Sequence, residues 1–363
     1  MKIVVLVGGG HAHLHGLKQF AENPREDVQL VLISPAAYQY YSGMFSGFTE
    51  GVYGLDEIRI DLKRLAEKIG VAFYQDTICA IDPVSRTLTG LHGQSYPYDV
   101  VSFDIGSQTD SPEALRKYIS PIKPNYHFPK QLLTFRESAK PVIVGGGASG
   151  VELALSTHAW RKRQHLPLNG SLFSSGPLLS AQGAEASKKI EAIARKKELP
   201  FFTDVQIEDI DETSITASNG TTYPQTAVLW LTGPKSPAFF ERSGMPVDCS
   251  GFLAVNESLQ SPRFPEVFGA GDCVSIDRYP TLEKNGVYAV RQGPVLWNNL
   301  MGFLDKQALS RFVPQSRYVS ILSTGGGEAF LTYGRWALHG RVPWKIKQYI
   351  DQKFMKAYQA IYQ

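Results

Sequence analysis

Two stretches of the chain share one pattern of apolar and small residues. In each, a short run of β-branched and aliphatic residues leads into glycines and then into helical spacing of apolar positions. The first is residues 3–13, IVVLVGGGHAH, and the second is residues 141–152, PVIVGGGASGVE. A strand that continues through glycines into a helix presents free N–H groups and a helix dipole to an anion. Each stretch therefore predicts a site for the pyrophosphate of a dinucleotide.

The pattern elsewhere predicts alternating strands and helices. Strands are expected at 28–33, 71–73, 78–81, 87–88, 100–103, 172–174, 228–231, 267–271, 318–322 and 329–332. Helices are expected at 61–68, 148–163, 185–197 and 283–303, and from 343 to the end. Prolines and aromatic residues in 111–129 predict a linker, because proline disfavours both a helix and a central strand.

These elements predict an α/β fold with two Rossmann-like, three-layer ββα nucleotide-binding domains. The chain of 363 residues is long enough for two or three domains. We expect the first domain at 1–110 and 251–312, with the second, at 130–250, inserted into it. Residues 313–363 are expected to form a small α+β C-terminal region with a hairpin and a basic amphipathic helix.

Composition narrows the classes of function. With 43% hydrophobic residues, 20% charged residues and a formal net charge of +3, the chain is an ordinary globular protein without the charge of a nucleic-acid binder. Its three cysteines, Cys79, Cys249 and Cys273, lack C-x-x-C spacing and predict a reducing compartment. No apolar run approaches the roughly 20 residues that span a bilayer. We therefore expect a cytoplasmic protein, with any membrane contact peripheral.

The first glycine stretch departs from the usual dinucleotide motif. Gly8 allows the tight turn and Gly10 allows the backbone to approach a pyrophosphate, but His13 replaces the third glycine. Ser34 ends the next strand, where an acidic residue commonly binds a ribose. His11 and His15 share a helix face, yet no carboxylate or cysteine lies near them in sequence, so a phosphate turn is favoured over a metal site.

The second stretch carries the complete motif. Gly145, Gly147 and Gly150 form G-x-G-x-x-G, and Glu152 follows two residues later. Ser175 lies after the next strand, where an acidic residue would favour NADH and an arginine would favour NADPH. A serine serves either cofactor, so the donor stays open.

A third motif, Gly271-Asp272, closes the strand expected at 267–271. Its carboxylate is suited to accept hydrogen bonds from the ribityl hydroxyls of a flavin. The alternative is a simple cap of the next turn. The two dinucleotide motifs upstream favour the flavin.

In this order, the motifs resemble the two-dinucleotide-domain flavoproteins of the pyridine nucleotide-disulfide oxidoreductase superfamily. Within it, the chain is similar to type II NADH dehydrogenases and to the dehydrogenase-like proteins fused to selenide, water dikinase. The narrower resemblance rests on residues 7–13, 41–44, 55–62, 286–294, 323–327 and 344–355.

The resemblance implies FAD in the first domain and NADH or NADPH in the second. It implies FAD contacts at Gly8, Gly10, His11, Ser34, Gly106, Gly271, Asp272 and Gln292, with Tyr41, Ser42 and Met44 beside the flavin ring. It implies NAD(P)H contacts at Gly145, Gly147, Gly150, Glu152, Ser175 and Gly233. No side chain is implied as an acid–base catalyst, because hydride transfer to a flavin requires none.

The implied activity is hydride transfer from NAD(P)H to FAD, followed by electron transfer to a small-molecule acceptor, expected to be a quinone. Type II dehydrogenases carry paired glutamines at the quinone pocket, whereas this chain has Arg291 and Gln292. Two alternatives stay open. One is an enzyme like sulfide:quinone oxidoreductase, which needs a cysteine pair at the flavin, and the other is a non-catalytic flavin- and nucleotide-binding redox sensor.

The final helix is expected to be amphipathic, so it could provide a surface for a partner. Ile346, Ile350, Phe354, Tyr358 and Ile361 recur at near-helical spacing, with lysines between them. Such a helix can lie on an anionic membrane, pack on the protein's own body, or join the partner subunit of a homodimer.

Overall fold

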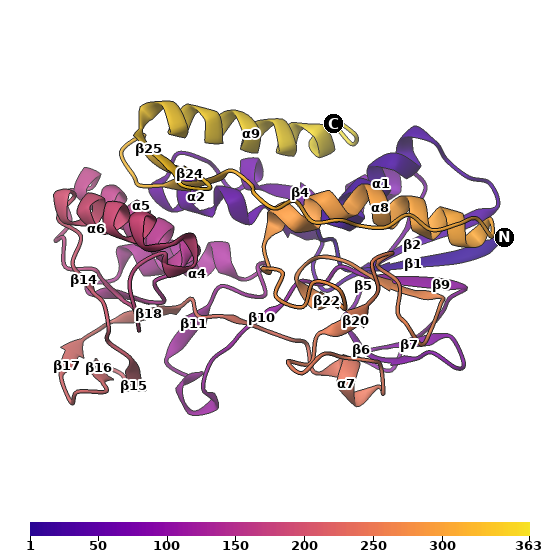
Figure 1. Cartoon of the computed structure of the whole chain (residues 1–363), viewed down its shortest axis with the longest axis horizontal. Coiled ribbons are helices and arrows are strands. Elements are labelled where there is room, and N and C mark those ends of the chain that lie inside the picture. The colour runs from indigo at the N-terminus through magenta and orange to yellow at the C-terminus, as the bar shows by residue number, and fades with distance from the viewer.

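The first part of the fold is a parallel sheet in the strand order β21-β9-β1-β2-β5. The computed structural model describes residues 1–363. The strands are β1 (Lys2–Val7), β2 (Val28–Ser34), β5 (Ala72–Gln75), β9 (Val100–Phe103) and β21 (Val267–Gly269). Figure 1 shows helices α1 (His11–Glu22) and α8 (Gly286–Leu304) above this sheet and strands β6 (Ile78–Asp82) and β7 (Thr87–Gly90) below it. Strand β8 (Ser95–Pro97) pairs with β7. Both faces are covered, so the strands are apolar without alternation.

The second part repeats this plan with a parallel sheet in the order β11-β18-β12-β13-β14. The strands are β11 (Ile119–Pro121), β12 (Pro141–Val144), β13 (Ser171–Phe173), β14 (Phe201–Phe202) and β18 (Ala227–Trp230). Helices α4 (Phe128–Glu137), α5 (Ala148–Arg163) and α6 (Ala184–Lys196) and the hairpin strands β15 (Ile207–Ile210), β16 (Ser214–Ala217) and β17 (Thr222–Pro224) complete it. All of these elements lie between β9 and β21 in the chain, so the predicted insertion of one Rossmann-like unit into the other is confirmed.

The prediction of a linker over 111–129 is wrong at its centre. Residues 119–121 form β11, which pairs in parallel with β18. Pro121 is tolerated because β11 lies at the edge of the sheet, where an N–H is dispensable. The second sheet therefore begins before residue 130. A short antiparallel pair, β10 (Gln108–Thr109) and β19 (Pro234–Lys235), joins the two connections between the units.

Shorter elements fill the space around the sheets. They are α2 (Phe45–Glu50), α3 (Leu62–Lys68), α7 (Phe239–Arg242), β3 (Tyr38–Tyr40), β4 (Arg59–Asp61), β20 (Leu253–Val255) and β22 (Val274–Ile276). The predicted helices begin and end within about four residues of those observed, the largest difference being at the end of the final helix, which stops at Gln359 rather than at 363. Helix α8 starts at Gly286 rather than at 283 because the Asn285 side chain caps it, accepting from the N–H groups of Val287 and Tyr288.

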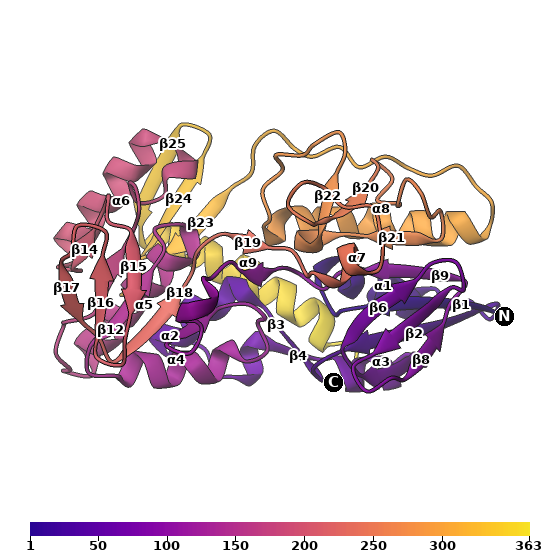
Figure 2. The same ribbon diagram turned by 90° about the horizontal axis from the view of Figure 1, so that it is seen from below.

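The C-terminal region is a three-stranded antiparallel sheet followed by a long helix. Strands β23 (Ser320–Ser323), β24 (Ala329–Tyr333) and β25 (Trp336–Gly340) precede α9 (Arg341–Gln359), and β25 is one strand more than the sequence predicted. In Figure 1, α9 lies along the upper side of the molecule, above α2 and β24, and Figure 2 shows it crossing between the two units. No helix has the length and apolarity that crossing a membrane requires.

The buried face of α9 differs from the apolar stripe predicted for it. Its buried residues are Pro343, Trp344, Lys347, Asp351, Met355 and Tyr358. Ile346 and Ile350 belong to the predicted stripe, yet they are 39% and 47% exposed. Phe354, Tyr358 and Ile361 of the stripe do pack on the core. The stripe is therefore wrong only in its first half, where the buried face of the helix contains the ion pair of Lys347 and Asp351.

His13 explains how α1 tolerates the missing third glycine. Its ring is 1% exposed and lies between the turn and β9. Nδ1 contacts the Gly8 carbonyl oxygen at 2.7 Å, and Nε2 contacts the Ser102 hydroxyl at 2.8 Å. Since a carbonyl only accepts, Nδ1–H donates and Nε2 accepts from the hydroxyl. Burial lowers the pKa of His13 to about 4, so the ring is neutral.

The third glycine of the second motif has no such substitute. A Cβ at Gly150 would lie 1.8 Å from the Gly145 carbonyl oxygen. We expect Gly150→Ala to lower the free energy of unfolding by about 1–3 kcal/mol, the cost typical of overpacking. Denaturant unfolding followed by circular dichroism measures the change.

Gly147→Ala is the matched control for this variant. A Cβ at Gly147 meets no atom within 4 Å. Its effect should stay within about 0.5 kcal/mol. Equal stabilities for the two variants would contradict the close packing of α5 on β12.

Candidate dinucleotide sites

The first glycine turn lies at the carboxyl end of β1, where α1 begins. Gly8 has φ +92°, and a Cβ there would lie 2.4 Å from the backbone oxygen of Asp104, so only glycine fits. Ser34 ends β2, and Gly106 follows β9 with φ +70°. Because β2 and β9 flank β1 in parallel, these predicted residues lie at one edge of the sheet, the edge where such folds bind ligands.

A carboxylate that the sequence analysis missed occupies the start of α1. Asp104 Oδ2 accepts from the N–H groups of Ala12 at 2.8 Å and His13 at 3.1 Å. A Cβ at Gly10 would lie 2.2 Å from this carboxyl group, so Gly10 makes room for Asp104. Burial raises the pKa of Asp104 to about 7, although the two N–H donors favour the charged form.

A cavity beside this turn brings three predicted FAD residues together. Gly271, Asp272 and Gln292 line it, with residues from the start of α8. The Gly271 N–H donates to Gln292 Oε1 at 2.6 Å. Lys123 Nζ donates to Asp272 Oδ2 at 2.6 Å and to the Ser107 hydroxyl at 2.7 Å. Asp272 is therefore held by a lysine that the sequence analysis had placed in a linker.

The residues predicted beside a flavin ring lie between α1 and α9. The Tyr41 ring stacks on Phe354 with centroids 4.5 Å apart and meets the His11 ring edge-on at 5.6 Å. Met44 is 1% exposed, whereas Ser42 is exposed. Burial lowers the pKa of His11 to about 4, so its ring is neutral. The aromatic stack closes this side of the turn against water.

The second glycine turn is open. The Gly145 turn leads into α5, and the N–H groups of Ala148, Ser149 and Gly150 have no acceptor within the protein. No atom comes within 4 Å of a Cβ at Gly147. Such unpaired donors at a helix start are suited to phosphate oxygens. Ser175 and Gly233 are exposed after β13 and β18.

Glu152 faces the C-terminal region as well as the second unit. Its Oε1 accepts from the Ser46 hydroxyl and from the Ser323 N–H, both at 2.8 Å. Lys347 Nζ lies 3.7 Å from the same oxygen. The predicted nicotinamide contact therefore joins α5, α2, β23 and α9.

Lys347 is the buried centre of this junction, and the sequence analysis did not single it out. Its Nζ donates to Asp351 Oδ2 at 3.1 Å and to the Gly43 carbonyl oxygen at 2.5 Å. Burial favours the neutral amine, but the carboxylates of Glu152 and Asp351 outweigh it and raise the pKa of Lys347. The ammonium therefore fixes the loop of residues 41–44 against α9.

The cysteines lie apart in the fold and form no disulfide. Cys273 is fully buried and donates to the Ala270 carbonyl oxygen at 3.2 Å. Burial raises the pKa of its thiol to about 12. Cys79 and Cys249 are both exposed. Cys273 therefore behaves as a small buried side chain.

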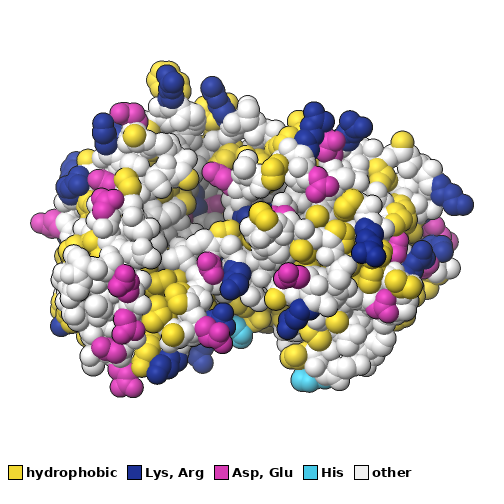
Figure 3. Space-filling view, turned by 60° about the horizontal axis from the view of Figure 1, so that its bottom comes forward, with side chains coloured by type: hydrophobic (Ala, Val, Ile, Leu, Met, Phe, Trp, Pro, Cys, Tyr) yellow, Lys and Arg dark blue, Asp and Glu magenta, His cyan; other side chains and the backbone are white.

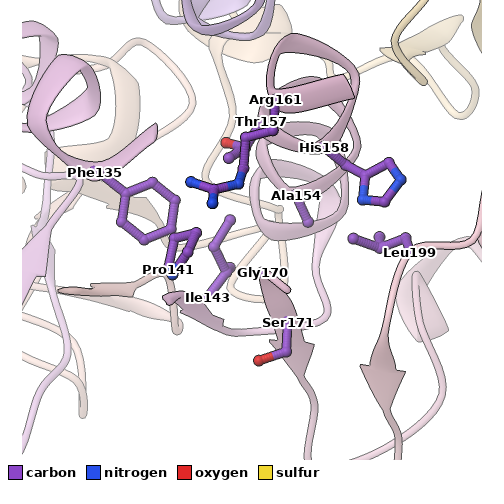
Figure 4. Close-up of a pocket in the computed structure, with 10 residues that line it drawn as sticks. All are labelled: Phe135, Pro141, Ile143, Ala154, Thr157, His158, Arg161, Gly170, Ser171 and Leu199. Carbon is purple, nitrogen blue, oxygen red and sulfur yellow. The ribbon is translucent and has the colours of Figure 1, made fainter. Parts of the chain in front are cut away.

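A separate pocket lies under the C-terminal half of α5, away from the glycine turn (Figure 4). The Arg161 guanidinium points into it and donates to the carbonyl oxygens of Arg136, Ser138 and Pro167. The Thr157 hydroxyl and His158 Nε2 are buried there without a partner. Because Arg161 is already satisfied by backbone carbonyls, the pocket belongs to the packing of α5 on the sheet.

Comparison with known proteins places this geometry in a family. Residues 2–298 match the model of the pyridine nucleotide-disulphide oxidoreductases. The NADH dehydrogenase-like protein YutJ of Bacillus subtilis is 23% identical over 359 residues, which cover 96% of this chain and 97% of that protein. The resemblance stated from the motifs is therefore confirmed.

Two solved structures share the fold over nearly the whole chain. NDH2 of Plasmodium falciparum in complex with NADH aligns with a TM-score of 0.83 at 14% identity, covering 99% of this chain and 97% of that one. The sulfide:quinone oxidoreductase of Aquifex aeolicus aligns with a TM-score of 0.82 at 19% identity, covering 99% and 92%. Both alignments include the C-terminal region, so its sheet and helix belong to the shared architecture.

The buried position of Lys347 predicts a large effect of its removal. Lys347→Met leaves Asp351 and Glu152 buried without their cation, and we expect a loss of about 3–5 kcal/mol in the free energy of unfolding. Denaturant unfolding measures it. Lys345 is exposed on the same helix, so Lys345→Met should change stability by less than about 0.5 kcal/mol. Similar values for both variants would show that the buried ion pair does not hold α9.

Proposed function

The chain belongs to the pyridine nucleotide-disulphide oxidoreductase family, and on that basis we propose that it is an FAD-dependent NAD(P)H dehydrogenase that passes electrons to a quinone. The observation that carries the proposal is the repeated sheet. Two parallel sheets, which share the order of four strands (β9-β1-β2-β5 and β18-β12-β13-β14), each place a glycine turn and a helix N-terminus at the carboxyl end of β1 or β12. Two dinucleotides on one chain make hydride transfer between them the natural chemistry.

The cavity beside the first turn supports FAD as the resident cofactor. The Asp272 carboxylate is an acceptor suited to ribityl hydroxyls, and the N-terminus of α8 lines the same cavity. The Gln292 side chain holds Gly271 in its turn, while Arg291 is exposed. When bound, FAD supplies the two-electron chemistry. Asp272 and Gln292 orient the cofactor, and the stack of Tyr41 on Phe354 excludes water from it.

The open second turn supports NAD(P)H as the donor. The three free N–H groups at the start of α5 are the donors that a pyrophosphate needs, and Gly147 leaves space above them. Figure 3 shows the face hollowed between the two units, with charges of both signs spread over it. Glu152 lies at the junction of the units, where it holds Ser46 and Ser323 in position.

The quinone acceptor rests on relatives and on the surface of the C-terminal region. One structural neighbour is named a sulfide:quinone oxidoreductase. Apolar side chains are exposed on β25 and α9, namely Trp336, Leu338, Val342, Ile346, Tyr349 and Ile350. The exposed Lys345 and Lys353 lie on the same helix. This apolar and basic face suits contact with an anionic membrane, whose apolar interior dissolves quinones.

The cysteines support this proposal over a sulfide-oxidising enzyme. Such an enzyme needs two cysteines at the flavin, and Cys273 is buried without a cysteine partner. The structure therefore favours NAD(P)H as the electron donor over sulfide.

Anaerobic titration with NADH, and separately with NADPH, tests the function. We expect stoichiometric bleaching of the flavin absorbance by one or both nucleotides, followed by reoxidation on addition of a short-chain quinone. A flavin that dithionite bleaches but neither nucleotide does would refute the dehydrogenase and favour a redox sensor. Gly147→Leu tests the second site. It should lower the affinity for the nucleotide at least about tenfold, which is about 1.4 kcal/mol, and leave the FAD content unchanged.

Vesicle flotation tests the proposed membrane contact. We expect binding to vesicles with anionic lipid, and Ile350→Glu should weaken it because a charge enters the apolar face. Val84 is 87% exposed on the turn between β6 and β7, so Val84→Glu is a matched control that should leave binding unchanged. Equal binding by the two variants would place the contact elsewhere.

A further inference from the structure

We propose that Asp104 couples FAD binding to the uptake of one proton, because its carboxylate and the FAD pyrophosphate compete for the same helix N-terminus. The inference rests on the proposed function, in which the first glycine turn holds the pyrophosphate. FAD then binds the form of the protein in which Asp104 is a neutral carboxyl group. The proton comes from solvent and stays on Asp104 in the complex.

The two glycine turns of the chain differ at one position that explains this competition. The backbone oxygen facing Gly8 belongs to Asp104, and the one facing Gly145 belongs to Leu231, and each lies 2.4 Å from the point that a Cβ on the glycine would occupy. These residues are therefore equivalent in the two units. In the second unit, three N–H groups at the start of the helix are free. In the first, Asp104 takes two of the three, and only His11 N–H is free.

No cation compensates the Asp104 carboxylate. On α1, His11 and His13 have their pKa lowered to about 4 by burial, so both are neutral near pH 7. Asp272, on the turn before β22, adds negative charge, but Lys123 is paired with it. Cys273 in the same turn is a neutral thiol, and Lys284 before α8 donates to the Val274 carbonyl oxygen. The charged form of Asp104 therefore depends on the two N–H groups and the helix dipole.

The direction of the pH dependence follows from these charges. Burial raises the pKa of Asp104 to about 7 without FAD. A pyrophosphate brings negative charge next to it and raises the pKa further in the complex. Both states are protonated below pH 7, so affinity is greatest there. Above pH 7 only the complex keeps the proton, and the affinity falls by up to about tenfold per pH unit.

The test measures FAD affinity of the full chain by flavin fluorescence between pH 6 and pH 9. We expect the wild-type dissociation constant to rise between about tenfold and hundredfold from pH 7 to pH 9. Asp104→Asn should flatten this dependence and bind more tightly than wild type at pH 9. The Asn side chain is neutral at every pH: its oxygen is suited to cap the Ala12 and His13 N–H groups without FAD and places no charge against the pyrophosphate when FAD binds. Asp99→Asn, which alters the carboxylate paired with Lys2 just before β9, should retain the wild-type slope.

A second measurement needs no variant. Calorimetric titration of FAD at pH 8 in two buffers of different ionisation enthalpy counts protons, and we expect an uptake approaching one. A flat wild-type profile, an Asn variant that keeps the slope, or zero proton uptake would overturn the inference while FAD binding stands. Absence of FAD binding at every pH from 6 to 9 in both proteins would instead overturn the proposed function, and the inference with it.

Discussion

The N–H groups at the start of a buried helix need an acceptor, and this requirement organises both halves of the molecule. A parallel sheet with a glycine turn brings such groups to one edge. The first unit supplies a protein carboxylate, Asp104, for two of them, whereas the second unit leaves all three free. One architecture thus contains two helix starts with different electrostatics. The start of α5 is free to bind an anion, whereas the start of α1 already contacts the Asp104 carboxyl group.

The C-terminal region depends on the same balance of buried charge. Lys347 enters the interior on α9 because Glu152 and Asp351 face it, and its remaining donor capacity meets the Gly43 carbonyl oxygen. Removing a buried charge's partner costs far more than a surface pair contributes. The ion pair therefore fixes α9 over the loop of residues 41–44, and that loop in turn presents Tyr41 to His11. The position of α9 therefore determines where Tyr41 lies relative to His11.

How much the sequence predicted depended on whether local chemistry or tertiary packing determines a feature. The glycine motifs and their strand–turn–helix units were predicted because a close backbone approach leaves only glycine, as at Gly150. The prediction of a linker was wrong at Pro121 because an edge strand tolerates proline. Lys347 and Asp351 are four residues apart on a helix, a spacing typical of an exposed pair, and only packing buries them. Asp104 carried a signal that was overlooked: it follows β9 as Leu231 follows β18.

His13 and Asp104 are two parts of one departure from the glycine motif. His13 replaces the third glycine, and its ring bonds to Gly8 and to Ser102 of β9, while its N–H supports Asp104. An ionised carboxylate is costly to bury without a cation, and this cost raises the pKa of Asp104 to about 7. A neutral carboxyl removes that cost and adds an O–H donor. In the proposed FAD site, the group that opposes a pyrophosphate when ionised can therefore donate to it when protonated, and this difference is the basis of the proposed pH dependence.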